Sequence, residues 1–370
     1  MNSTQTEQSA TMLIESSPQI RSRVTTARIM WLVVIALLPA GVWGVVVFGI
    51  RSLAALLIST AAAVLTEWLL NIALGKRTIA DGSAFLTGLL IGFNMPPQVP
   101  LFIPVVASVF AIAIVKWSFG GLGANWMNPA LAGRVFVFFS WTSGMSSWKV
   151  PSSLAGMPDA LSGATPLGMY KTGMMELTGS GTGTAEFLRN QGYVASRAAQ
   201  SIADYLGGIF GSRPSEFNID LFLGNTAGCI GEVSALLLIA GAIFLLSRKI
   251  LTWHTPVAYI ASFALLTWVF GGLSFGNGFF QGEVWFNLFS GGLMLGALFM
   301  ATDMVTSPLT GRGMIIYGIG AGFLTFLLRF FGSLPEGVSL AIIIMNIFVP
   351  MIDRYVKPKL FGRVKKGKGE

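Results

Sequence analysis

Apolar runs of about 20 residues recur along the whole chain and constrain its fold more than any other feature. A run of this length can cross the hydrocarbon core of a membrane as one helix. Only 11% of the 370 residues are charged, whereas a soluble domain carries about 25%. A transmembrane barrel would show alternating segments of about ten residues in place of solid runs. The sequence therefore predicts an all-α polytopic membrane protein.

The runs predict about ten transmembrane helices, five in a first membrane half (29–143) and five in a second (227–353). They fall near 29–50, 52–74, 82–95, 101–117, 129–143, 227–247, 253–271, 284–302, 313–331 and 337–353. An N-terminal segment (1–28), a long loop (144–226) and a basic tail (354–370) complete the chain. Residues 1–20 lack the pattern of a signal peptide, so we expect the first span to be retained as an anchor.

The net charge of +8 comes largely from basic residues beside the expected spans. Arg21, Arg23 and Arg28 precede the first span, and the tail after the last span is rich in Lys and Arg. Basic residues in this position set the orientation of membrane helices and favour the cytoplasmic side. We therefore expect both termini in the cytoplasm and the 144–226 loop outside. The basic residues are expected to face the lipid bilayer, and we expect no nucleic-acid partner.

The two halves also resemble each other weakly. The segments 86–90 and 119–122 are echoed by 295–298 and 331–334. An odd number of spans per half would invert the second copy relative to the first, as in many transporters that hold ligands near the bilayer midplane. The sequence predicts two inverted five-helix repeats, although glycine-rich apolar sequence also matches itself by chance.

The segment 119–130 is the densest unusual stretch within the membrane region, and it reads FGGLGANWMNPA. Gly121 and Gly123 allow backbone conformations that other residues avoid. Asn128 is placed to cap a helix that begins at Pro129. Irregular backbone at membrane depth must be buried in protein or line a cavity. Two interpretations remain: a cofactor pocket that includes Asn125 and Asn128, or a tight turn between helices with an Asn cap.

Few side chains of this chain could carry chemistry of their own. Cys229 and His254 are its only cysteine and histidine, which excludes an iron–sulfur cluster or a structural zinc site held by this chain alone. Glu67 lies inside the second span. Two interpretations are open: its carboxylate is part of an ion or proton path, or it makes a buried polar contact. We expect no catalytic residue and no metal site, so a bound cofactor would supply any reaction.

The outer loop contains the sequence Asp159-Ala160-Leu161-Ser162-Gly163-Ala164-Thr165-Pro166-Leu167. This sequence resembles the flavinylation motif of the RnfD/NqrB family of membrane redox subunits. The segments 81–88 and 116–123 also resemble that family, and the chain's length favours its RnfD branch. The resemblance implies that a flavin transferase attaches FMN through a phosphoester to Thr165, with Asp159, Ser162, Gly163 and Ala164 forming the rest of the site. The alternative is an ordinary loop or helix-capping threonine.

The resemblance further implies a flavin-carrying subunit that relays electrons in a bacterial inner-membrane complex. Such complexes couple ferredoxin and NAD redox chemistry to Na⁺ or H⁺ translocation, and their other Rnf subunits carry the iron–sulfur and nicotinamide chemistry. The chain is then part of a translocase and is not active alone. The family also implies a non-covalent riboflavin, for which the region of Gly121, Gly123, Asn125 and Asn128 is the candidate.

Two alternatives remain open from the sequence. One is an NqrB-like subunit of a Na⁺-translocating NADH:quinone oxidoreductase. The other is a small-solute channel or transporter, which would carry no flavin. The carboxylates near the spans do not distinguish Na⁺ from H⁺.

Overall fold

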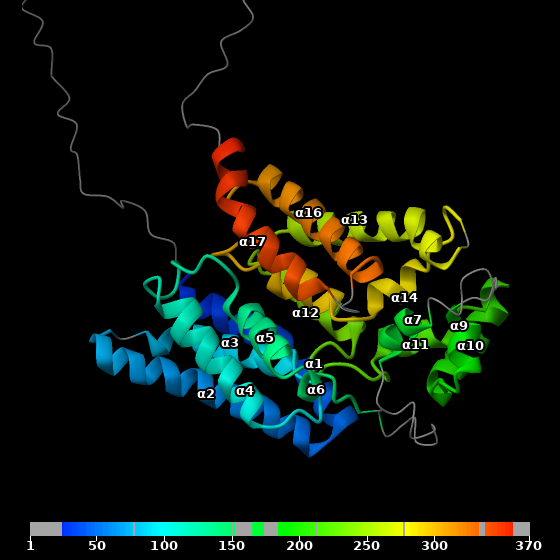
Figure 1. Ribbon diagram of the computed structural model, residues 1–370, viewed down its shortest axis with the longest axis horizontal. Helices are drawn as coiled ribbons and strands as arrows, with labels where there is room; N and C mark the ends of the chain where they lie inside the picture. Colours follow the sequence, from blue (N-terminus) through cyan, green and yellow to red (C-terminus); the bar gives the residue numbers. More distant parts are fainter. Residues whose placement is uncertain are drawn as a thin grey trace, which may run out of the picture.

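The protein consists of two bundles of apolar helices joined by a smaller helical cap (Figure 1). The structure, a computed structural model, describes residues 24–76, 78–149, 151, 165–173, 184–211, 213–276, 278–332 and 337–357. Across these ranges the regular elements are all helices. Five of the helices are long and apolar enough to cross a membrane, and four shorter apolar helices accompany them. The expectation of an all-α polytopic membrane protein is therefore confirmed.

The first bundle, coloured blue to teal in Figure 1, contains two long helices and several short ones. Gly49, with φ 91°, is the single residue that separates the long helices α1 and α2. The helix α4 continues directly into the π-helix η2. The elements are α1 (Thr26–Phe48), α2 (Ile50–Leu74), η1 (Ile79–Asp81), α3 (Ser83–Phe93), α4 (Phe102–Val109), η2 (Phe110–Trp117), α5 (Pro129–Ser140) and α6 (Thr142–Met145).

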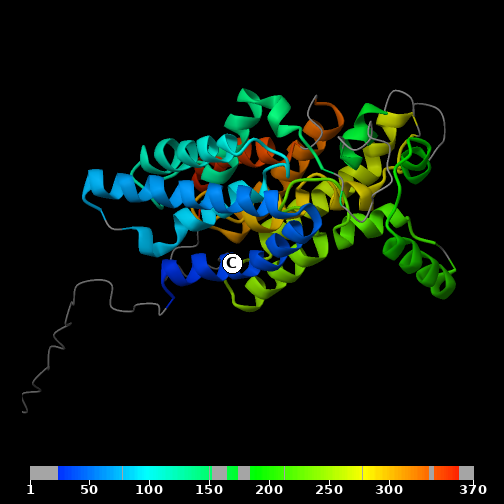
Figure 2. The ribbon, with the colours of Figure 1, turned by 90° about the horizontal axis from the view of Figure 1, so that it is seen from below.

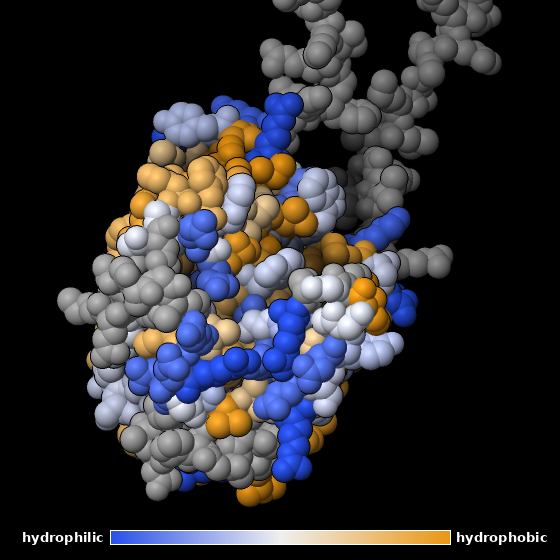
Figure 3. Space-filling model, turned by 90° about the vertical axis from the view of Figure 1, so that its right-hand side faces the viewer, coloured by the Kyte–Doolittle hydropathy of each residue, from blue (hydrophilic) through white to orange (hydrophobic). Residues whose placement is uncertain are grey.

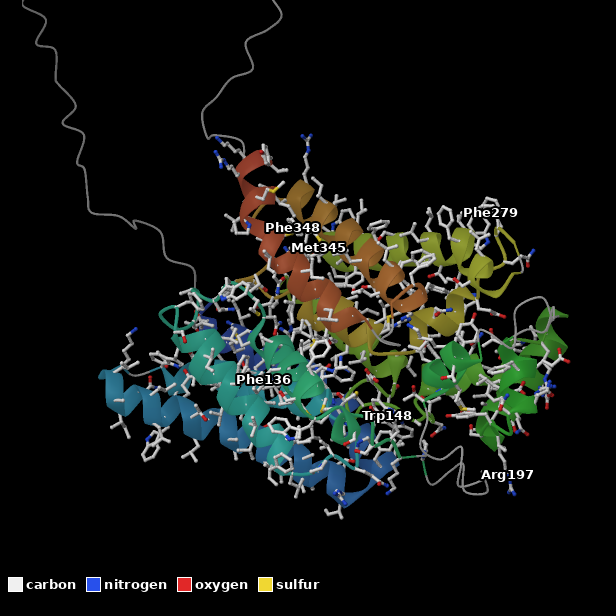
Figure 4. All side chains as sticks on the ribbon, viewed as in Figure 1. Phe136, Trp148, Arg197, Phe279, Met345 and Phe348 are labelled. Carbon is white, nitrogen blue, oxygen red and sulfur yellow. The ribbon has the colours of Figure 1, made fainter. Side chains whose placement is uncertain are left out.

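The cap belongs to the long loop between the bundles, and its helices are α7 (Pro166–Thr172), α9 (Thr184–Asn190), α10 (Arg197–Phe210) and α11 (Glu216–Leu223). Asp220 of α11 fixes the start of α10, because its carboxylate accepts hydrogen bonds from the backbone N–H and hydroxyl of Ser196. The helix α10 projects away from both bundles (Figures 1 and 2). This end of the molecule gathers hydrophilic side chains (Figure 3), and Arg197 lies there (Figure 4).

The second bundle differs from the expected spans at two places. The run at 227–247 becomes helical only at Ala235, and the run at 284–302 is broken after Phe289. The elements are α12 (Ala235–Ser247), α13 (His254–Phe270), η4 (Gly271–Phe275), α14 (Val284–Phe289), α15 (Leu293–Leu295), η5 (Gly296–Met300), α16 (Gly311–Phe330) and α17 (Val338–Tyr355).

The late start of α12 has a packing cause. The backbone N–H groups of Ile230 and Gly231 donate to the carbonyls of Met95 and Phe93, at 3.1 and 2.9 Å, at the end of α3. A Cβ on Gly231 would lie 2.1 Å from the ring of Phe93. The segment before α12 is therefore pressed against the first bundle, and its backbone pairs there and not within a helix.

The two bundles meet through two pairs of helices: α1 packs against α12, and α5 packs against α17. Ile29 at the start of α1, Ile250 after α12 and Asp303 after η5 line one common cavity, so they lie at one end of the molecule. The end of α1 lies at the cap, where the Trp43 indole donates to Gly224 O at 3.1 Å. Each bundle therefore extends between the same two ends.

A buried ion pair ties three elements of the first bundle together. The ammonium of Lys116, at the end of η2, lies 2.5 Å from Glu67 Oε2 of α2 and 2.6 Å from the hydroxyl of Ser83 at the start of α3. Thr78 donates to the other carboxylate oxygen of Glu67 at 2.7 Å. Both charged side chains are almost fully buried. Of the two interpretations of Glu67, the structure therefore shows the buried polar contact.

Replacing Lys116 with Leu leaves the Glu67 carboxylate buried without its partner. We expect this to lower the free energy of unfolding by about 3–5 kcal/mol, because an uncompensated buried charge is costly. Denaturant unfolding of the purified chain in detergent measures the change. The double variant Glu67→Gln, Lys116→Leu is the control, and it should recover most of the loss. Equal stability of Lys116→Leu and the native chain would contradict the pairing.

Candidate cofactor sites

Thr165 directly precedes α7, the helix of the cap that packs against the second bundle. Its backbone is extended and its Oγ accepts a hydrogen bond from the N–H of Gly168 at 3.0 Å, so it caps the helix. The side chain is only 9% exposed. Asp159, Ser162, Gly163 and Ala164, the rest of the predicted flavinylation motif, lie outside the described residues.

Thr165 lines a small cavity, which we call the Thr165 cavity; its volume of about 20 Å³ has room for about one water molecule. Three segments distant in sequence form it: the start of α7, the stretch before α12 and the break between α14 and α15. Its polar lining residues are Thr165, Thr226, Glu232 and Ser290. The hydroxyl of Ser290 is buried and has no hydrogen-bond partner among the described residues. Ser290 therefore lines the cavity and has a buried hydroxyl that no described residue uses.

The break after α14 is built from Ser290, Gly291 and Gly292. Both glycines adopt left-handed backbone conformations, with φ 66° and 68°, and a Cβ on Gly292 would lie 2.3 Å from the carboxylate of Glu232. Arg329 of α16 satisfies the carbonyls that the break exposes. Its guanidinium donates to Asn287 O at 2.5 Å, Ser290 O at 3.2 Å and Gly291 O at 3.3 Å.

The helix α7 is held against the same region by its basic and aromatic side chains. The Lys171 ammonium donates to Arg329 O at 2.9 Å and to Gly332 O at 2.6 Å. Burial, and secondly the charge of Arg329, lowers the pKa of Lys171 to about 8. The ring of Tyr170 packs on Phe286 of α14, and burial raises the pKa of its hydroxyl. Thr165 is therefore fixed relative to α14 and α16.

A second and larger cavity lies at the opposite end of the molecule. It has a volume of about 870 Å³, including space open to its surroundings, and we call it the Asn125 cavity. Apolar side chains from both bundles form most of its walls. Its main polar lining residues are Ser83, Lys116, Asn125, Asn128, Thr302 and Asp303.

The two asparagines of the glycine segment have different roles there. The amide oxygen of Asn128 caps α5 by accepting from the N–H groups of Ala130 and Leu131, and its nitrogen donates to Met300 O at 3.2 Å. Its hydrogen bonds are therefore used within the protein. The amide nitrogen of Asn125 donates to Met127 O, but its buried oxygen has no partner among the described residues. Asn125 thus lines the cavity and keeps a buried acceptor that no described residue uses.

The glycines of this segment are needed for their backbone conformation. Gly121 and Gly123 have φ angles of 104° and 95°, which L side chains rarely adopt. A Cβ at either position would meet nothing within 4 Å. The backbone conformation of the turn therefore requires glycine at both positions. No neighbouring atom lies close enough to exclude a Cβ there.

The helix α12 separates the two cavities. Val233, just before its first residue, borders the Thr165 cavity, and Leu245, near its last, borders the Asn125 cavity. At the rise of an α-helix this separation is about 18 Å.

The structure brings Asn125 and Asn128 to one site with Lys116 and places Thr165 at another. Sequence reasoning missed Ser290, Glu232 and Asp303 as lining residues; the only signal was their position beside glycines or span ends.

Replacing Gly121 with Ala forces a side chain into the left-handed region. We expect the free energy of unfolding to fall by about 1–3 kcal/mol because of backbone strain. Gly208→Ala is the matched control, since Gly208 lies on the exposed side of α10 with open space around its Cα. That change should be neutral or stabilising by up to about 1 kcal/mol. Thermal unfolding of both variants in detergent compares them, and equal effects would rule out strain at Gly121.

Comparison with known proteins gives a consistent assignment. Residues 13–362 match the NQR2, RnfD, RnfE family. The D subunit of the proton-translocating ferredoxin:NAD(+) oxidoreductase complex of Clostridium ljungdahlii is 41% identical over 350 residues, 94% of this chain and 96% of that protein. The D subunit of the Na(+)-translocating ferredoxin:NAD(+) oxidoreductase complex of Acetobacterium woodii is 38% identical over 355 residues, 96% of each chain. The D subunit of the ion-translocating oxidoreductase complex of Stutzerimonas stutzeri is 37% identical over 369 residues, 94% of this chain and 95% of that protein. The chain therefore belongs to the NQR2, RnfD, RnfE family.

Proposed function

We propose that this chain is the D-type membrane subunit of a ferredoxin:NAD⁺ oxidoreductase complex that translocates Na⁺ or H⁺. The observation that carries the proposal is the near full-length similarity to the D subunits of two such complexes. One of those relatives is named for proton translocation and the other for Na⁺ translocation, at similar identity. The coupling ion therefore stays open. The other subunits of the complex are its partners.

We propose that FMN is attached covalently to Thr165 by a flavin transferase. A bound flavin supplies one- and two-electron redox chemistry, and the protein supplies its binding, orientation and electrostatics. Two features support this position. Thr165 lines a small cavity, and Ser290, whose buried hydroxyl has no partner among the described residues, lines the same cavity. Lys171 and Tyr170 hold the start of α7 in place, which would keep an attached group in one orientation.

The burial of Thr165 has a consequence for its modification. Its hydroxyl is mostly covered and accepts the N–H of Gly168. A transferase must reach this oxygen, so we infer that modification precedes the docking of α7 or requires α7 to move away. The helix is only seven residues long and begins at Pro166, directly after the threonine.

We propose that the Asn125 cavity holds a non-covalent riboflavin. Its apolar walls with a few polar groups are typical of cofactor sites. The unpartnered oxygen of Asn125 can accept a hydrogen bond from a ring N–H or a ribityl hydroxyl, and Asp303 offers further acceptors. Lys116 contributes a charge that Glu67 already neutralises. Gly121 and Gly123 themselves do not line this cavity, whereas Leu122 between them does.

We further propose about ten transmembrane helices in two inverted repeats, with both termini cytoplasmic and Thr165 outside the bacterial inner membrane. The contacts between α1 and α12 and between α5 and α17 support this, because they pair the first and the last helices of the two halves. If a two-fold axis relates the halves, each helix at their interface packs against the corresponding helix of the other half. The pairs α1 with α12 and α5 with α17 fulfil this condition. The same end of the molecule holds Lys116 and the start of α1, in agreement with the positive-inside rule.

Thr165→Val is expected to abolish covalent flavin, because no hydroxyl remains to form the phosphoester. The chain is produced together with its flavin transferase and its intact mass is measured, with in-gel flavin fluorescence as a second readout. Thr172→Val is the control, since this threonine lies on the same helix. It should keep full flavin loading. Loss of the cap alone costs about 1 kcal/mol, so the variant should still fold; undiminished flavin on Thr165→Val would disprove the assignment.

Asn125→Leu is expected to lower the riboflavin content of the purified chain, because it removes an unpartnered acceptor from a residue that lines the cavity. Flavin released by denaturation is quantified by chromatography, which separates it from flavin bound covalently. Asn190→Ala, at the exposed end of α9, is the matched amide control and should retain riboflavin. Equal riboflavin in Asn125→Leu and the native chain would contradict this site.

A further inference from the structure

The last turns of α2 extend beyond the neighbouring helices of the first bundle (Figures 1 and 2). A groove of about 510 Å³ lies beside them, and we call it the Lys76 groove. Its lining includes Trp68 and Ile72 of α2, Lys76 of the link after α2, and Ile79 of η1. Ligand sites commonly measure about 300–1,000 Å³, so the groove has room for a small molecule or a lipid head group.

Among the described residues that line the groove, Lys76 alone is charged. Its side chain is exposed. Its ammonium donates to Gly120 O at 3.3 Å and lies 5.2 Å from the centre of the Trp117 ring. A carbonyl and an aromatic ring carry no net charge, so these contacts orient the ammonium without neutralising it.

The carboxylates nearest in sequence to Lys76 are bound to other groups and do not line the groove. Glu67 pairs with Lys116, and Asp81 accepts hydrogen bonds from the backbone N–H and the hydroxyl of Ser83. Within the described part of the chain, Lys76 forms no ion pair. The groove therefore keeps a positive charge that a bound anion would balance.

The other side of the groove is apolar and exposed. Trp68, Ile72 and Ile79 each leave more than a third of their surface uncovered. Leu65 and Leu69 of α2 are exposed as well, and residues three or four apart on a helix share one face with Trp68 and Ile72. An exposed apolar face on a membrane helix is suited to contact with acyl chains. The groove therefore joins a surface for acyl chains to a single positive charge.

Tryptophans mark the level of the groove in the membrane. Trp68 lines it and Trp117 lies under the Lys76 ammonium. Trp31 of α1 covers the turn before α3, since a Cβ on Gly82 would lie 3.0 Å from its Nε1. Tryptophan is enriched at the interface between membrane and water. The groove thus lies at the level of lipid head groups, and in the proposed topology these belong to the cytoplasmic leaflet, which is rich in anionic lipid.

We propose that the Lys76 groove binds one anionic phospholipid, with the Lys76 ammonium on its phosphate and its acyl chains along Trp68, Ile72 and Ile79. Basic pockets beside transmembrane helices on the cytoplasmic side bind head groups of this kind. A zwitterionic lipid gains less, because its own cation offsets the attraction between its phosphate and Lys76. The proposal depends on neither of the proposed flavins, so the flavin experiments and this one fail separately.

Native mass spectrometry of the full chain in detergent measures the binding of added phosphatidylglycerol and phosphatidylcholine. We expect the native chain to bind phosphatidylglycerol more tightly. Lys76→Gln should weaken that binding about five-fold, the effect of one basic residue at an anionic lipid surface, and leave phosphatidylcholine binding unchanged. Lys76→Arg keeps the charge and should bind as the native chain does. Equal affinity of the native chain for both lipids, or undiminished phosphatidylglycerol binding by Lys76→Gln, would overturn the proposal.

Lys249→Gln is the matched control. It removes the same charge from an exposed residue outside the groove, next to Ile250, which lines the Asn125 cavity at the same end of the molecule as Lys116. This variant should keep its phosphatidylglycerol binding. An equal loss in both variants would reduce the effect to a general attraction between basic residues and anionic lipid, which contradicts a defined groove.

Glycerol phosphate distinguishes a lipid from a free phosphate. An excess of it should not displace phosphatidylglycerol, because it lacks the acyl chains that Trp68 and Ile72 contact. Displacement would show a site for a soluble anion and count against the lipid.

A melting experiment separates lipid binding from a local effect of Lys76 on α2, since a positive charge at the C-terminal end of a helix also stabilises the helix itself. A ligand that binds the folded chain raises its melting temperature. Phosphatidylglycerol should therefore raise the melting temperature of the native chain in detergent and raise that of Lys76→Gln by less. An equal rise in both chains would refute the contact with Lys76.

The assembled complex distinguishes a lipid from a subunit that covers the groove. A photoreactive phosphatidylglycerol is added to membranes that contain the complex, and the labelled peptides are mapped. We expect label within residues 68–80, reduced by an excess of phosphatidylglycerol and not by phosphatidylcholine. Label on this segment in the isolated chain but not in the complex would show that a partner subunit occupies the groove, and the proposal would be wrong.

Discussion

Backbone at membrane depth must find its hydrogen bonds inside the protein, and the organisation of this chain depends on that constraint. Three interruptions of helices receive hydrogen bonds from other segments of the chain. Arg329 binds carbonyls at the end of α14 and just after it. The stretch before α12 pairs with the end of α3, and Asn128 donates to the carbonyl of Met300, the last residue of η5. Because two of these three contacts join the first bundle to the second, the interruptions also fasten the two bundles together.

Both cavities occur at these interruptions. The Thr165 cavity is bounded by the break at Ser290 and by the non-helical stretch before α12. The Asn125 cavity is bounded by the glycine segment and by the residues that follow η5. A continuous helix presents side chains only, whereas a turn also exposes backbone groups and leaves space that neighbouring helices do not fill. Irregular segments therefore provide the places where a ligand can be held within a bundle.

The sequence predicts the helical class and the glycine turn from local patterns, whereas Thr165 is predicted from the resemblance of its loop to a flavinylation motif. Apolar length indicates the helices, and Asn128-Pro129 indicates a capped helix start, as the structure has it. The cavity around Thr165 is not predictable in this way, because Ser290 and Glu232 reach it from segments far along the chain. Nothing in their local sequence indicates which face of a turn they occupy. Likewise Lys116 flanks the glycine segment in sequence, but only the tertiary structure pairs it with Glu67.

The shortness of α12 also has an electrical consequence. Thirteen residues span about 20 Å, whereas the hydrocarbon core of a bilayer is about 30 Å thick. The two cavities at its ends are therefore closer to each other than the two membrane surfaces are. A charge that passed between them would cross a large part of the membrane potential within a short distance. The full potential is worth about 2.3 kcal/mol per elementary charge at 100 mV, so transfer along α12 would be sensitive to voltage.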